Sequence, residues 1–148
     1  MSNVLTGFFR WVCRLGLGGI FLYSGYVKLR SPLEFAAAVA GYQLLPAGAI
    51  YPVARYFPYL EVALGLLLLL GWRLRTWGVA ASALILFFIA IMALTHLRGI
   101  EADCGCFGAG EKISGLTLAR DSLLLVPALF LAWGHRLRRR GQSCVPAA

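Results

Sequence analysis

Residues 76–97 read TWGVAASALILFFIAIMALTHL, an uninterrupted apolar stretch without a formally charged side chain. A helix rises about 1.5 Å per residue, so this stretch is long enough to cross the roughly 30 Å hydrocarbon core of a bilayer. The rest of the chain has the same character, because 60% of its 148 residues are hydrophobic and only 14% are charged. An average globular domain is about 25% charged, and a soluble protein of this size has too little interior to hide so much apolar surface. The composition therefore predicts a small integral membrane protein.

Three further stretches are long enough to span a membrane, at residues 11–29, 53–72 and 113–133. Only residues 73–75 separate the second of these from residues 76–97, so the two neighbouring spans are expected to form an antiparallel hairpin. The predicted fold is all-α, a polytopic membrane protein built as a four-transmembrane-helix bundle. We expect a single membrane domain over residues 1–148.

A shorter helix is expected between the first two spans. Ser31 followed by Pro32 is typical of a helix start, with serine as the N-cap and proline at the first helical position. The run ends at Pro46, which leaves too few residues to cross a membrane. It therefore predicts a short interfacial or re-entrant helix between helices 1 and 2.

The basic residues predict the orientation. With four spans, both termini and the short turn lie on one side, which holds eight of the 14 basic residues and none of the six acidic ones. These eight are Arg10, Arg14, Arg73, Arg75, Arg136, Arg138, Arg139 and Arg140. By the positive-inside rule, both termini and the basic tail 134–148 are expected in the cytoplasm, and the two longer loops in the periplasm of a bacterial inner membrane. The net charge of +8 is then explained by anionic lipid head groups, and no nucleic-acid partner is expected.

Two cysteines one residue apart lie in the loop after residues 76–97, as Cys104-Gly105-Cys106. Gly105 permits the tight backbone needed to join the two sulfurs, and a disulfide over so small a ring is strained and readily reduced. On a periplasmic face disulfides persist. The motif therefore predicts thiol–disulfide exchange at Cys104 and Cys106, an oxidoreductase chemistry. A structural disulfide is the alternative, although a bridge between residues two apart adds little stability.

His96 precedes Cys104 by eight residues. If the loop folds back, its imidazole would favour a reactive thiolate, and the alternative is an interfacial histidine without a chemical role. A metal site would need His96 and Asp103 in addition to the cysteine pair. Because that spacing matches no standard zinc pattern, no metal site is predicted. Cys13 and Cys144 fall on the cytoplasmic side, about 30 Å from the pair, so direct exchange with it is not expected and their roles stay open.

Charged residues inside the apolar spans form a second set of candidates. Ionised groups in hydrocarbon are costly, so they should turn inward and pair, which makes a binding site the first hypothesis. We expect Glu61 to pair with Arg120. Together with Asp121, Lys28 and Ser24 they are predicted to hold a cofactor, with a quinone as the candidate. The alternative is a polar clasp that only holds helices together.

Several motifs are shared with a known family. They are GIFLYSGYVK at 19–28, Ser31-Pro32, YQLLP at 42–46, Glu61 with Gly65, DCGCFG at 103–108, and Arg120-Asp121. On these motifs the chain resembles the DoxX-like superfamily and, within it, the methylamine utilisation protein MauE family. The resemblance implies a four-helix membrane protein linked to periplasmic disulfide formation, which acts with a thioredoxin-like partner in maturing the disulfide-rich small subunit of methylamine dehydrogenase. DoxX relatives are also associated with quinone-linked sulfur oxidation.

The motif and the resemblance together predict an integral membrane thiol–disulfide redox component. It would support periplasmic disulfide formation or enzyme maturation, and its expected partners are the lipid bilayer, a periplasmic thioredoxin-like protein and a maturing periplasmic enzyme subunit. A non-catalytic membrane assembly factor for a periplasmic enzyme is one alternative. A small transporter is another, although the near absence of ionisable groups in the cytoplasmic half of the spans speaks against it.

Overall fold

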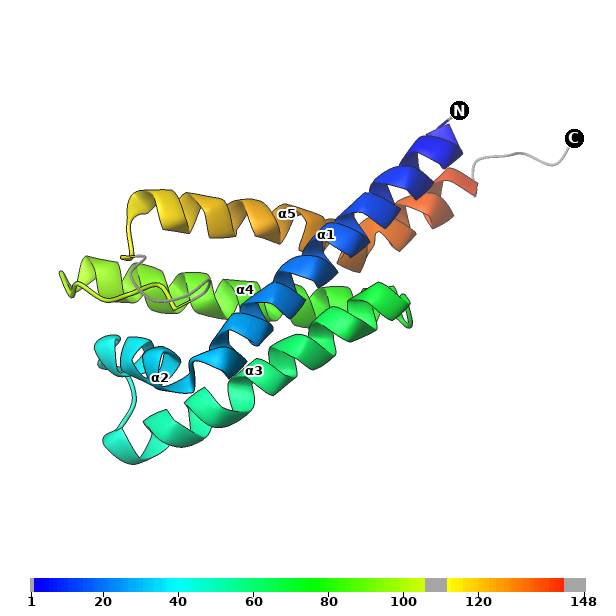
Figure 1. Cartoon of the computed structure of the whole chain (residues 1–148). Helices are drawn as coiled ribbons and strands as arrows, with labels where there is room; N and C mark the ends of the chain where they lie inside the picture. Colours follow the sequence, from blue (N-terminus) through cyan, green and yellow to red (C-terminus); the bar gives the residue numbers. More distant parts are fainter. Residues whose placement is uncertain (1, 106–111, 143–148) are drawn as a thin grey trace, which may run out of the picture.

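The computed structural model describes the backbone of residues 2–105 and 112–142 and the side chains of residues 4–105 and 112–133. Within these ranges the chain forms five helices and no strand beyond an isolated bridge. The helices are α1 (Ser2–Arg30), α2 (Pro32–Gly41), α3 (Ala47–Leu70), α4 (Leu74–Leu97) and α5 (Gly115–Gln142) (Figure 1). All but α2 contain stretches long and apolar enough to cross a membrane. The predicted all-α fold, with four spans and one short helix between the first two, is confirmed.

Three helix boundaries differ clearly from the prediction, and the first is the start of α1, which lies at Ser2 and not near residue 11. α3 begins at Ala47 and continues through Pro52 and Pro58, because a proline inside a helix removes a hydrogen bond and bends the helix without having to end it. α5 continues to Gln142, whereas its apolar part ends at Trp133. Arginine and leucine are good helix formers, so the helix extends past the apolar span into the basic segment.

The ends of the helices form two groups (Figure 1). The N-terminal part of α1, the α3–α4 turn and the C-terminal part of α5 lie at one end of the bundle. α2, the start of α3, and the chain that connects α4 to α5 lie at the other. This is the arrangement that four consecutive spans require, and it separates the arginine-rich end from the Cys104 end.

The bundle consists mainly of two closely packed helix pairs, α1 with α3 and α4 with α5. In the first pair, a Cβ atom on Gly65 would lie 2.9 Å from the Gly18 carbonyl oxygen. In the second pair, a Cβ atom on Gly78 would lie 2.9 Å from the backbone nitrogen of Ala132. Small residues are what allow helix backbones to approach this closely in a membrane.

The α3–α4 hairpin is held by a glycine cap and by an arginine from α1. Gly71 has φ +75°, the left-handed conformation typical of a helix C-terminus. Arg14 donates hydrogen bonds to the Leu69 carbonyl from Nε, at 3.1 Å, and from Nη2. A cation at the C-terminal carbonyls of a helix also interacts favourably with the helix dipole, which explains how an arginine is accommodated at this end of α1.

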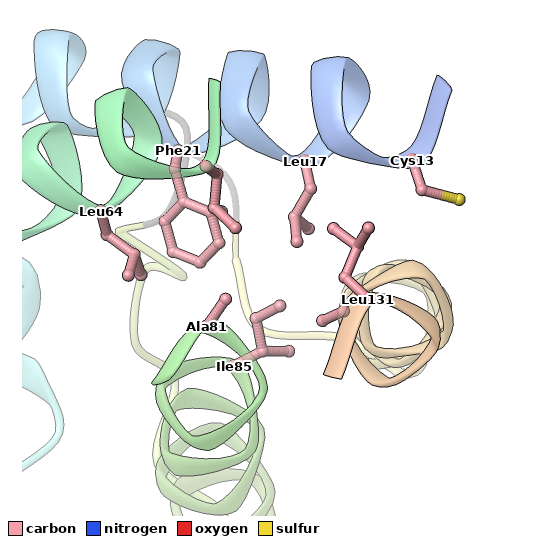
Figure 2. Close-up of a cluster of buried hydrophobic side chains, with 9 residues drawn as sticks. Cys13, Leu17, Phe21, Leu64, Ala81, Ile85 and Leu131 are labelled. Atoms are coloured by element: carbon pink, nitrogen blue, oxygen red, sulfur yellow. The ribbon is translucent and has the colours of Figure 1, made fainter. Parts of the chain in front are cut away.

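An apolar core joins the two helix pairs. Its buried residues are Cys13, Leu17, Phe21, Leu64, Leu68, Ala81, Ile85, Ala128 and Leu131. Figure 2 shows Leu17 and Phe21 of α1 extending towards the α4 and α5 side chains, with Cys13 at the edge of the same cluster. Cys13 therefore packs in the apolar interior.

α2 covers the other end of the bundle. Ser31 occupies its N-cap and Pro32 its first turn, as predicted, although Ser31 makes no side-chain capping hydrogen bond. Phe35 and Val39 turn inward and pack with Ala54 of α3. α2 is thus a short helix whose apolar face is bound to the bundle.

Candidate functional site

Cys104 lies between α4 and α5, and its side chain is completely buried. Its Sγ is 3.4 Å from Sδ of Met92 on α4 and 3.9 Å from Nη2 of Arg120 on α5. The Tyr42 hydroxyl, just after α2, donates a hydrogen bond of 2.5 Å to the Cys104 carbonyl oxygen. Side chains from three parts of the chain therefore hold this cysteine at the end of the bundle.

The residue after Cys104 is a glycine with a left-handed backbone conformation. Gly105 has φ +65°, a backbone conformation that favours glycine over other residues. There is also little room for a side chain, because a Cβ atom at this position would lie 3.1 Å from Cβ of Ala38 and 3.4 Å from the Tyr42 hydroxyl oxygen. Gly105 therefore has a backbone conformation in which a glycine is favoured, whereas the predicted approach of the two sulfurs stays a prediction. Cys106, the second predicted catalytic cysteine, lies outside the described residues, as does Cys144.

The segment around Cys104 is tied back to the residues that precede α5. The Ile113 amide donates a hydrogen bond of 3.0 Å to the Ala102 carbonyl oxygen. On the exposed side, Lys112 Nζ lies 2.8 Å from Glu101 Oε2. This hydrogen bond and the lysine charge lower the pKa of Glu101 below its ordinary value, and the carboxylate in turn raises the pKa of Lys112. The ion pair thus links the two ends of the loop that carries the cysteine motif.

A second polar cluster lies deeper in the bundle, and its pairing differs from the prediction. Glu61 pairs with Lys28, whose Nζ lies 2.6 Å from Oε1 and 2.8 Å from Oε2. Ser24 accepts a hydrogen bond from the same ammonium at 3.0 Å and lies 3.4 Å from Glu61 Oε1. The two charged side chains are only 2% and 3% exposed. The predicted Glu61–Arg120 pair is therefore wrong.

The close crossing of α1 and α3 explains the pairing. A Cβ atom on Gly25 would lie 3.0 Å from the Pro58 carbonyl oxygen, so the two backbones are in contact one turn from the ion pair. Ser24 and Lys28 are four residues apart and share one face of α1. The long lysine side chain can then extend along α1 to a carboxylate deeper in the bundle.

Three phenylalanine rings surround the Lys28 ammonium. The ring centroids of Phe35 on α2, Phe57 on α3 and Phe88 on α4 lie 5.0, 5.5 and 5.2 Å from Nζ. Cation–π contacts are strongest where the cation is removed from water, as it is here. Sequence reasoning missed these rings, because each comes from a different helix and no spacing along the chain connects them.

Arg120 is turned towards Cys104 and its own neighbour. Its Nε lies 3.2 Å from Asp121 Oδ1, with the arginine side chain 36% and the aspartate side chain 8% exposed. Asp121 also lines a cavity of about 50 Å³ together with Ser24 and Glu61. Ser24, Glu61 and Asp121 therefore line one cavity, whereas the Arg120 guanidinium lies beside the Cys104 sulfur.

The matches to known proteins cover both clusters. The family model described as methylamine utilisation protein MauE matches residues 6–134. The chain belongs to the MauE family. It is 36% identical over 127 residues to the methylamine utilization protein MauE of Paracoccus denitrificans, which covers 84% of this chain and 68% of the relative. The MauE of Methylorubrum extorquens is 40% identical over 109 residues, which covers 72% of this chain and 59% of the relative. No solved structure matches the chain.

In this MauE-family chain, the cavity that Glu61 lines is small for the predicted quinone. The cavity beside Glu61 is about 50 Å³, whereas pockets that bind such ligands are about 300–1,000 Å³. It has room for about one or two water molecules. A larger apolar groove, about 490 Å³, lies between α3 and α4 and is lined on α4 by residues from Trp77 to Phe87. That part of α4 adjoins the α3–α4 turn, whereas Cys104 follows its opposite end, so neither space supports a quinone next to the cysteine.

His96 does not lie with the rest of the predicted site. Its side chain is exposed on the last turn of α4, while Thr95 and Met92 face inward. Among the described residues, no hydrogen bond joins His96 to Cys104, and it is Arg120 whose Nη2 lies 3.9 Å from the cysteine sulfur. Sequence reasoning also missed Met92 and Tyr42 as neighbours of the cysteine. A methionine or tyrosine in an apolar span is ordinary, so no signal in the sequence marked them.

Proposed function

We propose that this MauE-family chain is a membrane thiol–disulfide redox component that exchanges disulfides with a periplasmic thioredoxin-like protein. Cys104 and Cys106 are its reacting residues. The observation that carries the proposal is the position of Cys104, held at one end of a helical bundle with a left-handed glycine immediately after it. That arrangement favours a tight Cys-Gly-Cys turn, and strained disulfides are the readily exchanged ones.

The exchange needs only the cysteine pair and a partner dithiol. A partner thiolate attacks one sulfur of the Cys104–Cys106 disulfide, which forms a mixed disulfide and releases the other sulfur as a thiolate. The second partner thiolate then attacks the partner sulfur of the mixed disulfide and releases the second cysteine. The partner loses two electrons and the cysteine pair gains them; the reverse direction uses the same bonds.

The biological setting follows from the relatives. They are named for methylamine utilization, so we propose that the chain supports maturation of a periplasmic enzyme subunit in that process. The segregation of arginines to one end of the bundle supports an inner-membrane orientation with both termini in the cytoplasm and the Cys104 loop in the periplasm.

Trapping of a mixed disulfide tests the exchange. In cells, Cys104→Ser and Cys106→Ser are each expressed with a tagged chain, and disulfide-linked adducts are identified on non-reducing gels. We expect at least one variant to accumulate an adduct that reductant dissolves. Cys13→Ser and Cys144→Ser are the matched controls and should trap nothing. If neither Cys104→Ser nor Cys106→Ser yields an adduct, the exchange proposal fails.

Alkylation of intact cells tests the orientation. A membrane-impermeant maleimide is applied with and without reductant, and labelling of Cys106 is compared with that of Cys144. We expect Cys106 to react only after reduction, and Cys144 to react only after the cells are lysed. Labelling of Cys144 in intact cells would reverse the orientation.

Complete burial of Cys104 against Met92 favours a second candidate, a membrane assembly factor without redox turnover. In that case the cysteines only shape the loop that docks a maturing enzyme. The double variant Cys104→Ser/Cys106→Ser separates the two functions, because an assembly factor would retain enzyme maturation and a redox component would lose it.

A further inference from the structure

We infer that Arg120 is a positioning residue that stabilises the Cys104 sulfur as a thiolate during disulfide exchange. This inference rests on the exchange proposed above for Cys104 and Cys106. It gives Arg120 the role that the sequence had indicated for His96, and it specifies which sulfur of the pair is released as the charged species.

Arg120 places a positively charged group beside the Cys104 sulfur. Its Nη2 lies 3.9 Å from Cys104 Sγ, and the uncharged thioether of Met92 lies 3.4 Å from the same sulfur. A guanidinium stays ionised at every pH that proteins tolerate. A neighbouring arginine favours the thiolate over the thiol. The positive charge of Arg120 therefore suits a sulfur that carries negative charge during the reaction.

Asp121 limits how strongly the Arg120 guanidinium can stabilise a thiolate on Cys104. Its Oδ1 accepts a hydrogen bond from Arg120 Nε at 3.2 Å, so the carboxylate orients the guanidinium and neutralises part of its charge. Nη2 is left to face the cysteine. The Arg120 side chain is about one-third exposed, whereas the Asp121 side chain is buried and packed by its surroundings.

Other ionisable groups approach the cysteine segment from the remaining elements. The Tyr42 hydroxyl, which follows α2, is bonded to the Cys104 carbonyl oxygen. A small cavity beside Gly105 is lined by Lys28, Glu34 and Asp103, while His96 on α4 is exposed. Arg120, whose Nη2 lies 3.9 Å from Sγ, is therefore expected to contribute the largest part of the charge at the sulfur.

Burial assigns Cys104 its part in the exchange. A partner protein cannot easily bring a thiolate to a sulfur that is completely enclosed, so the attack falls on the sulfur of Cys106. The new bond joins the partner sulfur to Cys106, the Cys104–Cys106 bond breaks, and the electron pair goes to Cys104 as a thiolate. In the reverse direction this thiolate attacks Cys106 and expels the partner. Stabilising it makes Cys104 a better leaving group and the disulfide more oxidising.

The pH dependence of alkylation tests the role of Arg120. The starting variant is the full chain with Cys13→Ser, Cys106→Ser and Cys144→Ser, so that Cys104 is its single thiol. This variant is reconstituted in nanodiscs, and its rate of reaction with iodoacetamide is measured between pH 5 and 10. In this background, Arg120→Gln should lower the rate about tenfold below neutral pH and leave the rate at the alkaline plateau unchanged. Arg120→Lys should recover part of the loss, and Arg98→Gln, which removes an exposed arginine, is the matched control and should have no effect.

The opposite shift is expected when the aspartate is neutralised. Asp121→Asn frees the guanidinium of a competing charge, so the alkylation profile should move towards lower pH. With both cysteines present, Arg120→Gln should make the equilibrium constant for reduction by glutathione about tenfold less favourable, which corresponds to about 30 mV.

Two results would overturn the inference. One is a profile that Arg120→Gln leaves unchanged, and the other is a rate that falls by the same factor at every pH, which indicates altered access and not altered charge. Because alkylation needs no partner, these results are separate from the trapping experiment. If the cysteines trap an adduct but Arg120→Gln leaves the profile unchanged, the role of Arg120 is wrong and the exchange stands. If they trap nothing, the exchange itself fails.

Discussion

Replacing Lys28 with methionine is expected to destabilise the bundle severely. Lys28 and Glu61 are 2.6 Å apart and at most 3% exposed, so the substitution leaves a carboxylate buried without its cation. Removing one partner of such a pair costs about 3–5 kcal/mol. The three phenylalanine rings lose their cation at the same time, but because both losses arise from one group they are not added together.

Removing both charges should restore most of the loss. In Lys28→Met/Glu61→Leu neither side chain has to be desolvated, and buried ion pairs replaced by apolar residues of similar volume are often neutral or stabilising. We therefore expect the double variant to lie within about 1–2 kcal/mol of the parent chain. A double-mutant cycle should then report a coupling of at least about 2 kcal/mol between the two residues.

The free energy of unfolding can be measured by titrating the chain in mixed micelles and following its helix content. Arg30→Met is the matched control, because it removes a cation from an exposed position on the same end of α1 and should change stability by less than about 0.5 kcal/mol. The reasoning is refuted if Lys28→Met costs no more than this control. It is also refuted if Glu61→Leu adds to the loss instead of relieving it.

Three further predictions concern packing, pH and the segment that holds the cysteine. Gly65→Ala should cost about 1–3 kcal/mol, because its Cβ would lie 2.9 Å from a backbone oxygen of α1. Lys112 lowers the pKa of Glu101, so the stabilisation from this pair is present above the ordinary glutamate pKa and is lost as the pH falls through the lowered value. In Lys112→Met, a carboxyl NMR titration should show that the titration midpoint of Glu101 rises. Tyr42→Phe removes the hydrogen bond to the Cys104 carbonyl, and it should raise the alkylation rate of Cys104 by the same factor at every pH.

Each of these has a matched control or a contradicting result. Gly16 has open space around its Cβ position, so Gly16→Ala should be tolerated where Gly65→Ala is not. An unchanged Glu101 midpoint in Lys112→Met would mean that the ion pair does not persist in solution. For Tyr42→Phe, the exposed Leu33 on α2 provides Leu33→Ala as a control, and a shift of the pH midpoint instead of the rate would contradict a purely structural role.

The spans could be predicted because their signal is local. Length and apolarity along one helix decide whether it can cross a bilayer, and residues 76–97 carry that signal without help from the rest of the chain. The start of α3 and the end of α5 were harder to predict, because a proline does not always interrupt a helix and an arginine-rich segment can continue one. Those outcomes depend on backbone hydrogen bonds that composition does not report.

The ion pairs could not be predicted because they depend on how helices cross. Glu61 and Arg120 were paired on estimated depth alone, and depth does not say which helix faces which. The contact between Gly25 and α3 turns Lys28 towards Glu61, and this leaves Arg120 to face the cysteine. His96 was favoured by its closeness along the chain, whereas Arg120 reaches Cys104 from a helix that begins eleven residues after it.

The two polar clusters are connected, and the connection explains why a buried ion pair lies below a cysteine site. Lys28 contacts the ring of Phe35 on α2, and Phe35 lies against Gly105, within 3.6 Å of where a Cβ would be. α2 also leads to Tyr42, which is bonded to the Cys104 carbonyl. The ion pair therefore anchors the short helix that encloses the cysteine. The lysine charge and its contact with the Phe35 ring thereby add to the apolar packing of Phe35 and Val39 against α3.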